Sequence, residues 1–184
     1  MHGATAPLAL PPRIWVVGPC GSGKTTVAAR LADALGIPPT HLDDIHWNPG
    51  WIETRPEEER EAIGRVVERP SWVVDGNYGR LRRPHLDRVD LFVWLDLPLR
   101  VTLTRLMRRC LVRSVRRVPC CNGNYESLYR TFLDKESVLL WAVQTDARRR
   151  RELTRQMRGR NVVRLRTAAE IRDWLDRTAP TVAA

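Results

Sequence analysis

Short apolar runs alternate with amphipathic stretches along most of this 184-residue chain. The runs are rich in β-branched and aromatic residues, a composition typical of buried strands. Because they lack the polar alternation of a half-exposed strand, they favour a parallel sheet with helices on both faces. The predicted strands are residues 13–17, a short one ending at 41–43, 71–75, 91–96 and 161–165.

Apolar residues at helical spacing separate these runs. Val27, Leu31 and Leu35 predict a helix that ends at Gly36. Residues 44–55 are rich in Trp, Pro and Gly and predict an ordered loop, and Thr54 is the expected cap of the helix that follows. Further helices are predicted over residues 54–69, 99–113, 126–157 with an interruption, and 168–177. The pattern predicts a flexible tail at residues 1–12 and a single α/β domain over residues 13–184.

The composition excludes several classes of protein. With 43% hydrophobic and 28% charged residues, the chain cannot be disordered throughout. No apolar run approaches the roughly 20 residues of a membrane-spanning helix. The stretch up to Leu10 has no Arg or Lys ahead of its apolar part, unlike a secretory signal. We therefore expect a globular protein of the cytoplasm with no membrane partner.

The chain is strongly basic, with a net charge of +10 and 31 Lys and Arg, of which only Lys24 and Lys135 are lysines. This bias has two interpretations, a polyanionic partner or a coding preference for arginine. Arginines cluster within residues 105–117, whereas the run Arg148–Arg151 is interpreted as a solvated helix face. The four cysteines lack the spacing of a zinc site and are expected to be free thiols.

A phosphate-binding loop is the most specific motif in the sequence. Gly18 to Thr25 reads Gly-x4-Gly-Lys-Thr and lies between a predicted strand and a predicted helix. Such a loop presents backbone N–H groups to phosphate oxygens at the positive end of a helix. Lys24 can reach the β- and γ-phosphates of ATP, and the Thr25 hydroxyl can bind Mg²⁺. The expected nucleotide-binding residues are Gly18, Pro19, Cys20, Gly21, Ser22, Gly23, Lys24, Thr25 and Thr26.

Three aspartates follow predicted strands at the edge where the loop lies. Asp75 is the expected Mg²⁺ ligand together with Thr25, and Asp43 is expected to bind or deprotonate the acceptor. Asp96 precedes a helix and is interpreted as a structural cap. His46 is interpreted as a residue that packs or makes a hydrogen bond within its loop rather than as a substrate contact.

These motifs together resemble a known family. Gly18–Thr25, Asp75–Arg80, Leu95–Pro98 and the pair Arg105 and Arg109 resemble the P-loop kinases of the adenylate kinase type. A closer resemblance is to the adenylate-kinase-like proteins labelled DNA topology modulation proteins. It is carried by His41–Asp43, Trp47–Trp51, Asp75–Tyr78 and Asn122–Glu126.

The resemblance implies a three-layer P-loop NTPase fold with a five-stranded parallel sheet in the order 2-3-1-4-5. It implies an acceptor-side segment after the second strand and a short helical lid at about residues 105–130. Asp75 falls on the aspartate that helps to organise Mg²⁺, while Arg105 and Arg109 fall on arginines that neutralise the transferring phosphate. Adenylate kinases have Asp-Gly-Phe-Pro-Arg where this chain has Asp75-Gly-Asn-Tyr-Gly-Arg80, so AMP as acceptor is not implied.

The periodicity of residues 99–117 separates an apolar stripe from a basic one. Leu106, Met107 and Cys110 belong to the stripe expected in the core, and the arginines at 105, 109, 113 and 116 to the other side. The basic side is either a solvated face or part of the lid, with Asn122 and Asn124 at a flexible tip. Trp47 and Trp51 either line an acceptor pocket or anchor their loop, and the other five tryptophans are expected in the core.

The sequence therefore predicts an ATP- and Mg²⁺-dependent kinase for a small-molecule or nucleotide acceptor. Lys24, Asp43, Asp75, Arg105 and Arg109 are the expected catalytic residues. The alternative is a nucleotide-dependent regulator or NTPase that acts on nucleic acid. It is less favoured, because the chain has no helix-turn-helix, zinc finger or separate basic domain.

Overall fold

The computed structural model describes residues 10–128 and 137–179. Within them, five parallel strands form one sheet in the order β2-β5-β1-β6-β9. Counted along the chain, this is the expected order 2-3-1-4-5. The strands are β1 (Arg13–Val17), β2 (Pro39–His41), β5 (Trp72–Asp75), β6 (Leu91–Leu95) and β9 (Val162–Leu165).

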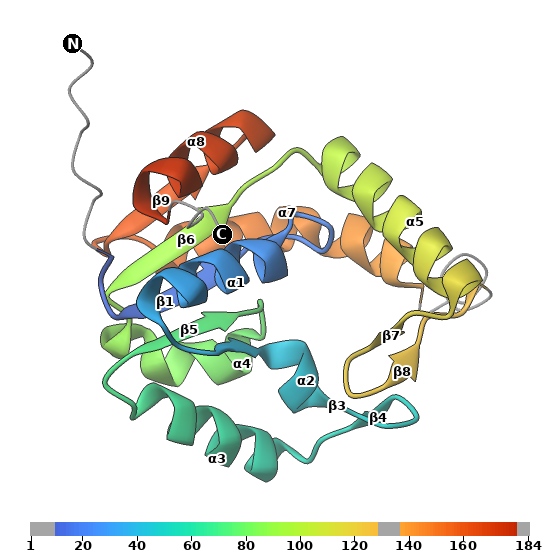
Figure 1. Cartoon of the computed structure of the whole chain (residues 1–184), viewed down its shortest axis with the longest axis horizontal. Coiled ribbons are helices and arrows are strands. Elements are labelled where there is room, and N and C mark those ends of the chain that lie inside the picture. Colours follow the sequence, from blue (N-terminus) through green and yellow to red (C-terminus); the bar gives the residue numbers. More distant parts are fainter. Residues whose placement is uncertain (1–9, 129–136, 180–184) are drawn as a thin grey trace.

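Helices cover both faces of the sheet, as Figure 1 shows. Side chains of β1 alternate between the two faces, so that Ile14 and Val16 pack under one layer and Trp15 and Val17 under the other. The first layer holds α1 (Lys24–Leu35) and α8 (Ala168–Thr178). The second holds α3 (Pro56–Val67), α4 (Gly79–Arg82), the 3₁₀ helix η1 (Arg83–Arg88) and the end of α7 (Val138–Gln156).

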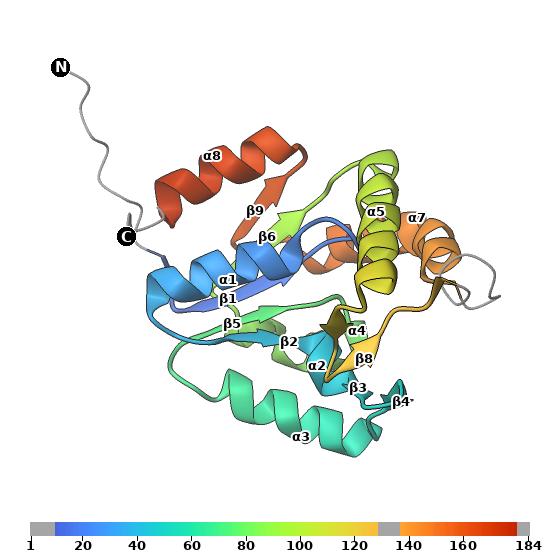
Figure 2. The ribbon, with the colours of Figure 1, turned by 45° about the vertical axis from the view of Figure 1, so that its right-hand side comes forward.

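Two short hairpins lie side by side at one end of the molecule, as both ribbon views show (Figures 1 and 2). The first follows α2 (Leu42–His46) and pairs β3 (Trp47–Asn48) with β4 (Ile52–Glu53). The second follows α5 (Leu99–Arg116) and pairs β7 (Pro119–Cys120) with β8 (Asn124–Tyr125). Below, residues 42–54 are called the acceptor segment and residues 119–125 the lid hairpin, after the roles expected from the sequence.

Several local predictions are wrong for identifiable reasons. Asp43 does not end a strand, because β2 stops at His41 and the chain turns at once into α2. Arg55, not Thr54, occupies the cap position of α3, and Pro56 begins that helix. Residues 44–55 contain the end of α2 and a hairpin rather than a plain loop. Turn-rich composition marks a break between elements but not the short elements inside it.

The predicted core is largely confirmed, with two corrections. Trp15, Trp72, Trp94 and Trp174 are buried, but Trp141 of α7 is 46% exposed. On α5, Leu106 and Cys110 are buried, whereas Met107 projects to the surface. All four cysteines lie in the described part of the chain and are free thiols, as expected.

The ends of the chain bear on other predictions. Residues 1–9 of the expected tail lie outside the described residues, while Leu10 packs against the core and Pro12 accepts a hydrogen bond from Trp72. Residues 129–136, within the predicted helix 126–157 and at the end of the expected lid, also lie outside them. Among the described helices, none has the length and apolarity needed to cross a bilayer.

Candidate phosphate-binding site and lid

The predicted phosphate-binding loop follows β1 and leads directly into α1 (Figure 1). Gly18 and Gly21 have positive φ angles of 153° and 79°. A Cβ atom at Gly18 would lie 2.6 Å from the Leu95 carbonyl oxygen, and one at Gly21 would overlap the carbonyl of Thr102. Only glycine fits this turn at both places. The loop is thus held between the sheet edge and α5, with backbone N–H groups at a helix start.

Lys24 is the first residue of α1, and its side chain returns over the loop. The ammonium Nζ donates to the carbonyl oxygen of Pro19 at 3.1 Å. This contact keeps the positive charge beside the backbone N–H groups that would receive a phosphate. The geometry fits the role expected of Lys24 from the sequence.

Asp75 lies at the end of β5, next to β1 and β2 in the sheet, and its side chain is only 5% exposed. One carboxylate oxygen accepts from the Thr25 hydroxyl at 3.0 Å, and the other lies 2.7 Å from Nδ1 of His41. The hydrogen bond to Asp75 raises the pKa of His41 above its usual value, against the opposing effect of burial. The structure thus brings together the two expected Mg²⁺ ligands and adds His41, a contact that the sequence did not predict.

Hydroxyl and carboxylate oxygens are hard ligands of the type that Mg²⁺ prefers. Thr25 and Asp75 supply one of each, close together beside the phosphate-binding loop. In the described part of the chain, no three His, Cys, Asp or Glu side chains are grouped so that they could hold a metal ion. The pair therefore fits an ion that takes its remaining ligands from phosphate and water, as Mg²⁺ does in nucleotide sites.

Asn77 positions the phosphate-binding loop, a role that the sequence reasoning missed. Its side-chain Oδ1 accepts from the N–H of Gly18 at 3.0 Å, and its Nδ2 donates to the carbonyl of the same residue. Asn77 follows Asp75 by two residues, so one short segment organises both the loop and the carboxylate. The only signal in the sequence was the family motif that contains it.

Asp43 lies in the first turn of α2, and its carboxylate is exposed. It accepts a hydrogen bond of 2.7 Å from the hydroxyl of Tyr78. Burial, followed by the negative charge of Asp43, raises the pKa of Tyr78 strongly, so the phenol stays protonated and donates. Asp75 is at the end of β5, and no hydrogen bond between Asp43 and Asp75 is present in the described residues.

The buried Glu59 links the acceptor segment to α4, through His46 and the half-exposed Arg80. Glu59 of α3 is fully buried, and its carboxylate lies 2.5 Å from Nδ1 of His46 and 2.7 Å from Nη2 of Arg80. The His46 ring also packs against Trp47 and Tyr78 at centroid distances of 4.5 Å and 4.7 Å. His46 is therefore a packing residue, as interpreted from the sequence, and Glu59 is the partner that the sequence did not reveal.

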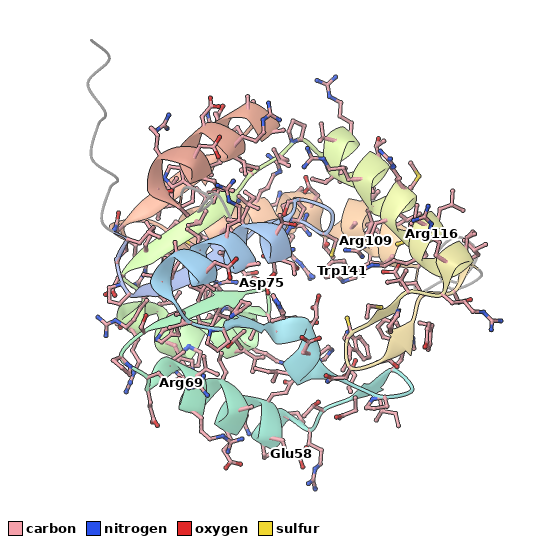
Figure 3. All side chains as sticks on the ribbon, in the orientation of Figure 1. Glu58, Arg69, Asp75, Arg109, Arg116 and Trp141 are labelled. Carbon is pink, nitrogen blue, oxygen red and sulfur yellow. The ribbon has the colours of Figure 1, made fainter. Side chains whose placement is uncertain are left out.

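The basic stripe of α5 divides into paired and unpaired arginines. Arg109 and Arg113 contact the Glu126 carboxylate at 3.3 Å and 3.4 Å. Arg105 is exposed and makes no ion pair or hydrogen bond within the described residues. In Figure 3, Arg109 lies on the side of α5 turned toward the centre of the molecule, while Arg116 lies farther along the helix.

Asp96 is structural, as expected, but it is not a helix cap. It is buried at the end of β6 and binds Arg164 at 2.6 Å and Arg150 at 2.9 Å. The interpretation of Arg148–Arg151 as a solvated face is therefore wrong for Arg150, and also for Arg149, which is buried against Asp146. The arginine run is split because a helix turns successive side chains through 100°, so two of the four face inward.

No family model matches the chain. It is 30% identical over 111 residues to a cytidylate kinase of Pyrococcus horikoshii, which covers 52% of this chain and 56% of that protein. The chain spans about half the length of the curated relatives it matches.

Solved structures share the fold over a greater length. A shikimate kinase from Bacteroides thetaiotaomicron matches 90% of this chain and 95% of its own, with a TM-score of 0.57 and 19% identity. A gluconokinase from Sinorhizobium meliloti matches 91% of each chain, with a TM-score of 0.51 and 20% identity. These two solved structures show the fold of this chain, and the kinases named in the comparisons act on different acceptors.

Proposed function

We propose that this protein is an ATP-dependent kinase that transfers the γ-phosphoryl group to a small-molecule or nucleotide acceptor. The main observation behind this proposal is the structure of the phosphate-binding loop. The Lys24 side chain folds over the loop, and the Thr25–Asp75 pair lies beside it. Loop, ammonium and oxygen pair are the parts that phosphoryl transfer requires on the donor side. The similarity to a cytidylate kinase supports the same reaction class.

Different residues would bind the phosphates, the metal ion and the transferring group of the donor. The N–H groups of residues 18–26 and the start of α1 would bind the phosphates, and Lys24 would balance their charge. Thr25 and Asp75 would hold Mg²⁺, which when bound neutralises charge on the phosphate oxygens. Arg105 and Arg109 of the lid would stabilise the charge that spreads over the transferring group.

The acceptor would lie between the donor site and the acceptor segment. Asp43 is exposed there, and the Tyr78 hydroxyl holds one of its oxygens. The other oxygen is then directed to orient an acceptor hydroxyl or to accept its proton. Trp47 and Trp51 pack against each other at a centroid distance of 5.5 Å and would form a wall of the site.

The acceptor can be identified by a turnover screen. Cytidine and other nucleoside monophosphates, shikimate, gluconate, nucleosides and short oligonucleotides would each be incubated with Mg²⁺ and ATP, and ADP formation measured. We expect one class to raise ADP formation well above the rate with ATP alone, and Lys24→Ala to abolish the increase. An increase that survives in Lys24→Ala would contradict the proposal.

A nucleotide-dependent regulator acting on nucleic acid is the less favoured alternative. Much of the arginine charge is engaged within the protein: Arg109 and Arg113 with Glu126, and Arg150 and Arg164 with Asp96. A DNA titration at several salt concentrations tests this alternative. Tight, saturable binding with a steep salt dependence would favour it over a kinase.

A further inference from the structure

The lid hairpin is fastened to the acceptor segment by asparagine side chains. Asn122 at the hairpin turn donates through Nδ2 to the carbonyls of Asp44 and Trp47, at 2.6 Å and 2.7 Å. The indole Nε1 of Trp51 donates to the carbonyl of Tyr125 at 3.2 Å. Figure 2 shows the two hairpins in contact from a second direction. The tip that the sequence suggested to be flexible is therefore anchored.

Asn124 is the central residue of this contact and is only 4% exposed. Its Nδ2 donates to the carbonyl of Asn48 at 2.9 Å and to that of Cys121, while its Oδ1 accepts from the N–H of Trp51 at 2.9 Å. Both ends of the amide are thus used, and each contact with the acceptor segment goes to backbone. Such a contact fixes the position of the segment whatever its side chains bind.

Glu126 directly follows β8 and connects the end of this strand to α5. Its backbone carbonyl accepts from the Ser114 hydroxyl at 3.0 Å, and its carboxylate Oε1 contacts Arg109 and Arg113. The side chain is 11% exposed, and it also faces the buried Cys110 thiol of α5. Burial, followed by the hydrogen bond and the negative charge of Glu126, raises the pKa of Cys110 to about 11. The contacts to the partly exposed arginines, at 3.3–3.4 Å, stabilise a fold little by themselves. Their geometric effect is to connect the end of the lid hairpin to the side of α5 that carries Arg109.

We propose that Glu126 is a positioning residue that couples the acceptor segment, through Asn124, to Arg109. Closure of the segment on an acceptor would move β8, and Glu126 would then set where the Arg109 guanidinium lies relative to the donor phosphates. This inference rests on the proposed function for the role of Arg109. Through this coupling, the lid hairpin would make phosphoryl transfer depend on the binding of the acceptor.

A double-mutant cycle tests the coupling. ATP turnover in the presence of Mg²⁺ would be measured for the wild type, Asn124→Ala, Arg109→Ala and the double variant. We expect Asn124→Ala to lower kcat about tenfold with KM for ATP unchanged, because Arg109 is misplaced rather than lost. In the Arg109→Ala background, Asn124→Ala should lower kcat by less than about twofold. Equal effects in the two backgrounds would overturn the coupling.

The carboxylate itself is tested by Glu126→Gln, with Glu126→Asp as the conservative variant. Gln keeps the shape but removes the charge, so we expect the same fall in kcat, and Asp should restore part of it. Glu61→Gln is the matched control, because Glu61 is an exposed partner of Arg65 at 2.6 Å. A wild-type kcat in Glu126→Gln would overturn the assignment.

A readout without turnover separates this inference from the proposed function. Hydrogen exchange of residues 47–54 would be followed in the full chain, where we expect Glu126→Gln to increase it about threefold or more. Unchanged exchange would overturn the coupling even if the protein proves to be a kinase. If the wild type consumes no ATP, the proposed function fails, and the exchange result still decides whether Glu126 and the acceptor segment are linked.

Discussion

The side-chain amide of Asn77 is paired with the backbone of Gly18 through both of its polar atoms. Gly18 opens the phosphate-binding loop, and Asn77 belongs to the segment that follows β5. The pair therefore ties the loop to the neighbouring strand in the sheet and fixes the direction of its first N–H group. An amide is needed for this, because it donates and accepts in one plane.

Replacing Asn77 by Asp keeps the shape but removes the donor and adds a negative charge beside the loop. We expect the affinity for Mg²⁺–ATP to fall about tenfold or more, because a lost hydrogen bond and phosphate repulsion act together. Calorimetric titration measures the dissociation constant. Asn161→Ala is the control, since Asn161 binds a backbone carbonyl far from the loop. Equal affinities for the two variants would contradict this role of Asn77.

Asp75→Asn tests the metal site. The variant keeps a group able to accept from Thr25 but loses the charge that attracts Mg²⁺. We expect the Mg²⁺ concentration for half-maximal ATP turnover to rise about fivefold or more, while ATP binding without Mg²⁺ is preserved. Titration of Mg²⁺ at fixed ATP gives this value. An unaltered Mg²⁺ dependence would remove Asp75 from the metal site.

Asp96→Asn tests the structural assignment of that residue. The change leaves two guanidinium groups without their buried carboxylate, and Arg164 also lies 4.0 Å from the centre of the Trp94 ring. We expect the free energy of unfolding to fall by about 3 kcal/mol, as for other broken buried pairs. Asp87→Asn is the control, because Asp87 is 95% exposed although it also binds an arginine. Denaturant unfolding of both variants measures the difference, and equal stabilities would contradict the assignment.

Asp90 gives a prediction for the pH dependence of stability. Its hydrogen bonds with Arg13 lower the pKa of the Asp90 carboxyl below its usual value of 3.8. A lowered pKa means that the stabilisation is complete above the usual value and is lost as the pH falls through the lowered one. Unfolding curves below pH 4 should therefore show a steeper acid loss for the wild type than for Asp90→Asn. Parallel curves would show that the pair does not contribute.

The strands, most helices and the phosphate-binding loop could be predicted because each is encoded by residues adjacent in the chain. Gly18 to Thr25 form a complete motif, and the run from Arg13 to Val17 needs no partner to be recognised as a strand. The site beyond the loop could be predicted only in part. Asp75 was found because it ends a strand, whereas Asp43 was assigned to the wrong element because short helices have little periodicity.

The contacts of Asn77 and Asn124 could not be predicted, because each joins segments far apart in the sequence. Asn124 binds residues more than 70 positions away, and Asn77 binds a glycine 59 positions away. Polar side chains of this kind have no pattern of their own. Their partners depend on the order of the strands in the sheet and on the contact between the two hairpins.

The binding of ATP at the loop can be measured directly, because Lys24 and Lys135 are the only lysines in the sequence. Each would be acetylated under limiting reagent with and without Mg²⁺ and ATP, and the rates read from separate peptides by mass spectrometry. We predict that the nucleotide slows the labelling of Lys24 about tenfold or more and leaves that of Lys135 unchanged. Labelling of Lys24 at the same rate with saturating nucleotide would contradict the central claim that this loop binds the phosphates of ATP.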